Sequence, residues 1–214
     1  MKNFIKEFVN NWYNISVYIA VAILLIVVFF IDDPLQKVLL CSAAVLFLHF
    51  FEEFGWPWGF PYMWMKVMMN SKETDSTKWN CNNLNSMYWN WLSAILIYIL
   101  PAFFTDVNFL VLGAMVLSCA ELIMHLLLFN IKEKTLYNPR LVSGLFGLVP
   151  IACYFFINIF DASNYVWYDY VGAVVWFGVI FWACFRSPWY WKIGWIKWYP
   201  LTDQSAYGYD KPKK

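Results

Sequence analysis

The sequence predicts an all-α membrane protein, and three observations support this fold class. Of the 214 residues, 62% are hydrophobic and 14% are charged, and the mean hydropathy is +0.52, far above that of a soluble domain of this length. Six apolar runs are each long enough to cross about 30 Å of hydrocarbon as a helix. The run 20–30 is apolar throughout, without the alternation of a transmembrane β-strand.

These runs predict a bundle of about six transmembrane helices. The spans lie near residues 12–31, 35–54, 86–104, 109–130, 141–160 and 167–185. The first run ends at Asp32 without the small-residue cleavage site of a signal sequence, so we count it as a span. The short links at 32–33 and 105–108 require antiparallel hairpins. Because no repeat or linker divides the chain, we expect residues 1–214 to form a single transmembrane domain.

The lysines and arginines are distributed asymmetrically over these spans. When the connections are assigned to alternate sides of the membrane, all but one of the 15 basic residues fall on one side, and Lys37 alone falls on the other. Basic residues concentrate in cytoplasmic loops. The pattern therefore predicts that both termini are cytoplasmic.

Two segments on the predicted cytoplasmic side are rich in aromatic residues. Residues 55–85 begin with a Trp- and Pro-containing stretch, and residues 186–214 interleave Trp with Lys between 189 and 198. Trp and Tyr favour the headgroup region, and cations favour the anionic leaflet. We expect both segments to lie at the interface, the first as an anchor or, alternatively, as a lid over a nearby site. The bilayer is the expected partner of the second segment, and no nucleic-acid partner is expected.

The strongest chemical signal is a pair of histidines that have carboxylates at helical spacing. His49 precedes Glu52 and Glu53 in the second span, and Glu121 precedes His125 in the fourth. Residues three or four apart share one face of a helix. Both spans run from the outside to the cytoplasm, and at about 1.5 Å rise per residue the two groups reach the same depth. We expect them to form one cluster in the cytoplasmic third of the membrane.

Buried carboxylates need compensation, and the spans contain no lysine or arginine other than Lys37, at the outer end of the second span. An acidic residue at a helix centre costs about 2.5–3.5 kcal/mol even on a lenient insertion scale, so a metal ion, protons or a water-filled cavity must offset it. Nitrogen and oxygen ligands of this kind suit Zn, Fe or Mn. The predicted ligands of a divalent metal ion are His49, Glu52, Glu53, Glu121 and His125. A proton relay and a purely structural network remain alternatives.

Asn90 enters the third span at about the same depth. It is a candidate contact for a ligand or for the substrate, although a polar residue near a helix end is also common. The zinc-protease helix His-Glu-x-x-His is not present, because each helix supplies one histidine. A di-iron bundle would need a fourth carboxylate within the spans.

Several motifs resemble the HXXEE-motif family of small bacterial membrane proteins. They are His49-Phe-Phe-Glu52-Glu53, the later Glu121 and His125, and Tyr137-Asn138-Pro139 followed by an apolar helix that contains proline. A glycine tends to follow the Asn-Pro pair in this family, and the chain has Arg140 there instead. The resemblance implies a bacterial cytoplasmic (inner) membrane location and a shared site, but it supplies no reaction.

Three functions are compatible with this site. The first is a metal-dependent intramembrane hydrolase acting on a lipid or lipid-linked substrate, with Glu53 as the general base. The second is a cation or proton transporter, which requires polar residues on both sides of the site. The third is a regulatory or accessory protein in which the metal only ties two helices together. A hydrolase predicts a cavity at the site, and an accessory protein predicts a closed shell of ligands.

Overall fold

The computed structural model confirms an all-α membrane protein. It describes residues 2–136, 138 and 141–208, and no strand occurs among them. Six helices are long and apolar enough to cross a membrane: Trp12–Phe30, Pro34–Phe54, Asn83–Phe103, Asn108–Glu133, Leu141–Asn158 and Trp167–Gly194. The predicted number of spans is therefore confirmed.

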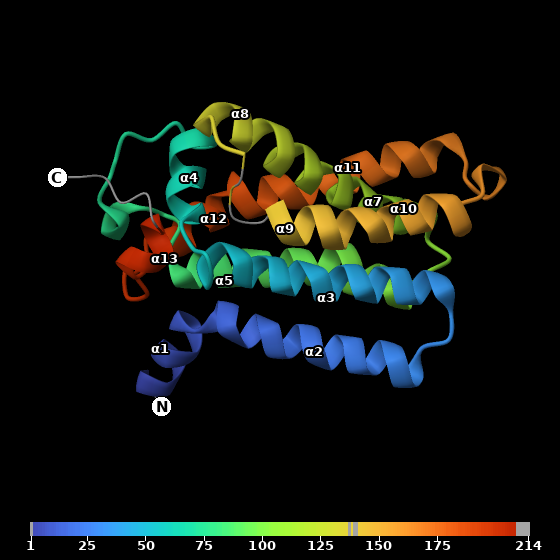
Figure 1. Ribbon diagram of the computed structural model, residues 1–214, viewed down its shortest axis with the longest axis horizontal. Coiled ribbons are helices and arrows are strands. Elements are labelled where there is room, and N and C mark those ends of the chain that lie inside the picture. Colours follow the sequence, from blue (N-terminus) through green and yellow to red (C-terminus); the bar gives the residue numbers. More distant parts are fainter. Residues whose placement is uncertain (1, 137, 139–140, 209–214) are drawn as a thin grey trace.

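The first two spans form a hairpin. Helix α1 (Lys2–Asn10) leads into α2 (Trp12–Phe30), and α3 (Pro34–Phe54) returns beside it (Figure 1). The carboxylate of Asp33 caps α3 by accepting from the backbone N–H of Gln36 at 2.6 Å, and Pro34 at the first helical position needs no N–H partner. Helix α3 packs against the first, third, fourth and fifth spans, so its residues are among the most buried in the bundle.

The next three spans each contain a π-helical stretch, in which the hydrogen bonds run from residue i to i+5. The third comprises α5 (Asn83–Ala94), η2 (Ile95–Ile99) and α6 (Leu100–Phe103). The fourth comprises α7 (Asn108–Leu122), η3 (Ile123–Phe129) and α8 (Asn130–Glu133). The fifth comprises α9 (Leu141–Ser143), η4 (Gly144–Leu148) and α10 (Val149–Asn158). Such wide turns are rare and frequently occur at functional sites.

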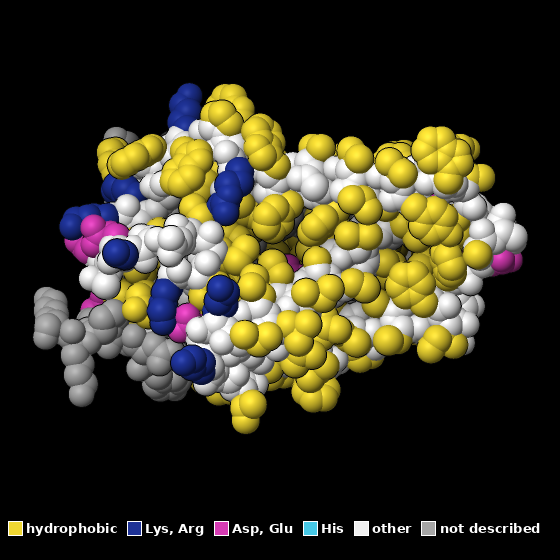
Figure 2. Space-filling view, turned by 90° about the horizontal axis from the view of Figure 1, so that it is seen from above, with side chains coloured by type: hydrophobic (Ala, Val, Ile, Leu, Met, Phe, Trp, Pro, Cys, Tyr) yellow, Lys and Arg dark blue, Asp and Glu magenta, His cyan; other side chains and the backbone are white. Residues whose placement is uncertain are grey.

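The sixth span and the short helices complete the molecule. Helix α11 (Trp167–Phe185) packs along α7 and is followed by α12 (Pro188–Gly194). The short helices are α4 (Phe60–Val67), η1 (Ser76–Lys78), η5 (Ala162–Asn164) and α13 (Asp203–Tyr207). Helices α1, α4, α12 and α13 lie at one end of the bundle (Figure 1). Lysine and arginine side chains gather toward this end, while hydrophobic side chains cover the middle of the face shown (Figure 2).

The third span begins earlier than its hydropathy indicates. Asn82 caps α5 by accepting from the backbone N–H of Asn85 at 2.9 Å, so the helix starts at Asn83 instead of 86. The Asn82 side chain also donates to the carbonyls of Gly194 and Ile196, at 3.0 and 3.2 Å. This asparagine therefore fastens the C-terminal segment to the start of the third span.

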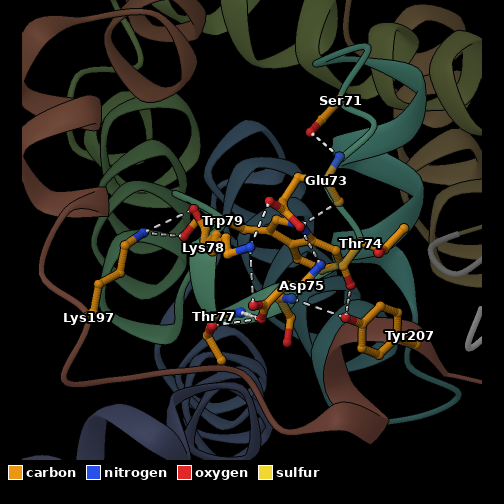
Figure 3. Close-up of polar contacts among 10 residues, drawn as sticks. Ser71, Glu73, Thr74, Asp75, Thr77, Lys78, Trp79, Lys197 and Tyr207 are labelled. Carbon is orange, nitrogen blue, oxygen red and sulfur yellow. Dashed lines mark hydrogen bonds and ion pairs between the residues drawn. The ribbon is translucent and has the colours of Figure 1, made fainter. Parts of the chain in front are cut away.

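A polar loop closes the same end of the bundle (Figure 3). Tyr207 on α13 accepts from the backbone N–H of Ser76 at 3.0 Å and donates to the carbonyl of Thr74. The backbone N–H of Asp75 and the Lys78 ammonium lower the pKa of the Glu73 carboxyl. The loop is thus held by α13 and by its own charges. Residues 209–214 of the predicted interfacial segment 186–214 lie outside the described residues.

Candidate functional site

Three of the predicted site residues meet inside the bundle. One oxygen of Glu121, Oε2, lies 3.4 Å from Nε2 of His49 and 3.4 Å from Nε2 of His125. The two imidazole rings are 5.5 Å apart and nearly perpendicular, at 83°. One ligand atom from each of the three residues lies within 4.8 Å of the others. The three residues are almost completely buried, with exposed fractions of 0%, 6% and 1% for His49, Glu121 and His125.

The fourth span brings two of these residues to the same point. Glu121 lies in the last turn of α7, and His125 lies four positions later, within the π-helical stretch η3. His49 approaches from α3, at the centre of the bundle. The cluster therefore joins two spans that are distant in sequence, as the matched depths predicted.

The side chain of Asn138 fixes the orientation of His125. Its amide nitrogen donates to the backbone carbonyl of His125 and to Oδ1 of Asn130, both at 2.6 Å. This leaves its carbonyl Oδ1 to face Nδ1 of His125, at 2.7 Å. Because that oxygen can only accept, Nδ1 of His125 must carry the proton.

The fifth span fixes His49 in a comparable way. The hydroxyl of Ser143 donates to Glu52 and lies 2.7 Å from Nδ1 of His49, so it accepts from that nitrogen. Glu52 also accepts from the backbone N–H groups of Val142 and Ser143, at 3.1 and 2.9 Å. The Glu52 carboxylate therefore caps the start of the fifth span and, through Ser143, orients His49.

These hydrogen bonds decide what the centre of the cluster can hold. With Nδ1 hydrogen-bonded in both rings, Nε2 of each histidine faces the same oxygen of Glu121. Three electron-rich atoms at this spacing repel one another unless a cation or a shared proton lies between them. Histidines that bind metals are typically oriented by a hydrogen bond from the other ring nitrogen, as both are here.

The remaining predicted site residues occupy different places. Glu52 takes part in the helix cap described above, and the group of three does not include it. Glu53 follows in the last turn of α3, one turn after His49, and is completely buried. Asn90 lines a cavity that Glu121 also lines. Whether any of them binds a metal or a substrate stays a prediction.

This cavity, of about 70 Å³, lies between the third, fourth and sixth spans, α3 and α4. Its wall is mainly aromatic and aliphatic, and includes Phe50, Phe60, Trp64, Leu117 and Phe181. A void needs about 10–15 Å³ to hold one water molecule, so there is room for several small groups beside the Glu121 carboxylate.

Helix α4 covers the cluster. Phe60 is buried, and its ring centre lies 5.7 Å from those of His125 and Phe129. Trp64 is also buried, and its ring centre lies 4.6 Å from that of Phe185 in the sixth span. The aromatic stretch after residue 55 therefore packs against the protein at Phe60 and Trp64, and its role as an anchor or a lid stays a prediction.

Two positioning residues, Ser143 and Asn138, are missing from the predicted site. Nothing in the spacing around Ser143 marks it, because it acts through Glu52 and His49, more than 90 positions earlier. Asn138 belongs to the Tyr-Asn-Pro motif, and its contacts with His125 become evident only in the folded chain. Tyr137, Pro139 and Arg140 of that segment lie outside the described residues.

The fold and the site together define a multi-pass α-helical membrane protein with a buried group of two histidines and one glutamate. A family model described as "protein of unknown function with HXXEE motif" matches residues 40–155, which is more than half of the chain. The chain belongs to this family, and the resemblance inferred from His49, Glu52 and Glu53 is confirmed. Searches of curated proteins and of solved structures found no match.

Proposed function

We propose that the protein is a metal-dependent intramembrane hydrolase acting on a lipid or lipid-linked substrate in a bacterial cytoplasmic membrane. The observation that carries this proposal is the convergence of two oriented histidines on the Glu121 carboxylate. Two imidazole nitrogens and one carboxylate oxygen form a ligand set that suits Zn, Fe or Mn and leaves a position open for water.

The protein residues have distinct roles in this reaction. His49, His125 and Glu121 would hold the ion, and Ser143 and Asn138 would keep both rings in the required tautomer. A bound ion would lower the pKa of a water molecule to about 7. Glu53 takes the proton of the attacking water and returns it to the leaving group, so that one water is consumed and no redox partner is needed. Its place one turn after His49 and its complete burial support this role.

The cavity favours an enzyme over the two alternatives. A metal that only ties helices together needs a closed shell of ligands, whereas Glu121 lines a cavity. A transporter needs polar groups along a route across the whole bilayer. The described cavity is lined mainly by apolar side chains and lies on one side of the cluster.

The test is metal content. Protein purified in detergent without chelator is analysed for bound elements and compared with His49→Ala, His125→Ala and, as a control, Glu133→Ala at the cytoplasmic end of the fourth span. Near-stoichiometric metal in the wild type and in Glu133→Ala, lost in both histidine variants, is expected. A wild type that binds no divalent ion, even after titration with Zn, Fe and Mn, would rule the proposal out.

A further inference from the structure

The cavity beside Glu121 has one polar wall and otherwise hydrocarbon surfaces. Aromatic and aliphatic side chains from α3, α4, α7 and α11 form most of its lining, and α5 contributes the amides and hydroxyls. Burial of hydrocarbon against such a surface is favourable by about 25 cal/mol per Å². The cavity is therefore suited to an apolar chain that ends in a small polar group.

The charges of the cavity lining restrict which polar group the bound molecule can carry. Glu121 is an acid, and none of the described residues that line the cavity is a lysine or arginine. Phosphate is usually bound by arginine, lysine or clustered backbone N–H groups. Outside the cluster the lining therefore offers no cationic partner to a phosphate group, which favours a neutral acyl carbonyl over a phosphoester.

Two polar atoms of the lining have no hydrogen-bond partner among the described residues. They are the indole N–H of Trp89 and Oδ1 of Asn85, in side chains of residues that are 7% and 1% exposed. A buried polar group left without a hydrogen bond costs about 1–3 kcal/mol. One donor and one acceptor match a ligand that carries a carbonyl and a hydroxyl or amide N–H.

The size of the cavity limits the number of chains. Its volume of about 70 Å³ is well below the roughly 150 Å³ of a void that admits benzene. A single hydrocarbon chain inserted end-on is narrower than a ring, whereas two chains side by side need a wider space.

We infer that the substrate is a neutral single-chain acyl lipid, an ester or amide of a fatty acid whose chain enters this cavity. The inference rests on the proposed function for the reaction and deepens it. Water adds to the acyl carbonyl carbon, the C–O or C–N bond breaks, and the proton passes to the leaving alcohol or amine. The products are a fatty acid and a neutral alcohol or an amine. Trp89 donates to the lipid, and Asn85 accepts from its hydroxyl or N–H.

Photocrosslinking tests this inference without turnover. The probe is a monoacylglycerol with a diazirine in its chain, irradiated with the purified protein, and the labelled residues are mapped by mass spectrometry. Ala120→Phe places a ring into the cavity from the fourth span, and Ala22→Phe is the matched control on the exposed face of α2. Ala120→Leu replaces Ala120→Phe if the larger variant does not fold.

We expect labelling of α5 and α11 residues around the cavity, reduced at least fivefold by Ala120→Phe and unchanged by Ala22→Phe. Trp89→Phe should weaken binding of the monoacylglycerol about 3- to 10-fold, the equivalent of one hydrogen bond, and leave binding of hexadecane unchanged.

Labelling confined to lipid-facing residues, or equal labelling of the cavity by a diazirine phosphatidylcholine, overturns the inference. Metal content separates the two proposals, because Ala120→Phe should keep its metal. If the wild-type protein binds no metal but is still labelled in the cavity, the lipid-binding site is supported and the proposed hydrolase activity is contradicted.

Discussion

At the scale of single residues, the site depends on side chains that do not contact the centre themselves. Ser143 links Glu52 to His49, and its hydroxyl is the group that determines which ring nitrogen of His49 carries the proton. Removing partners of this kind typically lowers metal affinity 10- to 100-fold.

We therefore predict that Ser143→Ala weakens metal binding about 10- to 100-fold, as measured by competition with a chelator of known affinity. The backbone N–H of residue 143 still reaches Glu52, so the fifth span stays capped and the protein stays folded. Ser163→Ala, in the exposed turn η5, provides the control. An affinity equal to wild type would show that the hydroxyl does not orient His49.

Glu53 has a different expected signature. The substitution Glu53→Gln keeps the size of this buried side chain but removes its capacity to take a proton. We predict that the variant retains its metal and loses about 10²- to 10⁴-fold in the rate of monoacylglycerol hydrolysis, the usual contribution of a general base. A variant that loses its metal instead would assign Glu53 to the ligands.

The sequence predicted the centre of the site but not its support. His49, Glu121 and His125 have a local signature, because helical spacing places a histidine and a carboxylate on one face of each span. Glu52 has the same spacing, yet its oxygens bind the start of a helix about 90 residues later. A contact of that separation leaves no local pattern, so the capping role of Glu52 could not be predicted.

At the scale of elements, the contact between α4 and α13 requires a glycine. Gly59 has a φ of +92°, and a Cβ at this position would lie 3.1 Å from the carbonyl oxygen of Tyr207. Glycine is the residue that adopts this backbone conformation without strain.

We predict that Gly59→Ala costs about 1–2 kcal/mol from backbone conformation alone and increases proteolysis near α13. Gly178→Ala is the matched control, because Gly178 lies within α11 and a Cβ there meets no atom within 4 Å. That change should leave stability equal or raise it by about 0.5–1 kcal/mol. Thermal unfolding in detergent measures both, and equal melting temperatures of the two variants would contradict the prediction.

The elements themselves were largely predictable. Runs of about 20 apolar residues gave the number of spans, because the bilayer imposes that length. The π-helical stretches were not predictable, since a wide turn has the same apolar composition as an α-helical one. The burial of α4 could not be predicted either, because Trp and Pro are as common at a membrane interface as in a segment that packs into the protein.

At the scale of the whole molecule, the charge asymmetry gives a prediction about orientation. Lysine and arginine side chains gather toward one end of the bundle on the face shown in Figure 2, the end at which α1 and α13 lie (Figure 1). In a background without the native cysteines, Asp32→Cys and Ala162→Cys should react with a membrane-impermeant maleimide added to intact cells. Gln204→Cys should react only after lysis. The reverse pattern would place the termini outside.

Because the helix cap at Glu52 needs the fifth span, the site can be completed only late in the synthesis of the chain. His49, Glu121 and His125 are all synthesised before Asn138 and Ser143, so for a time the nascent chain holds the three central residues without the partners that orient their rings. Only when the fifth span has inserted and its first turn has met Glu52 are both tautomers fixed. A chain that ends before the fifth span therefore cannot form the complete site.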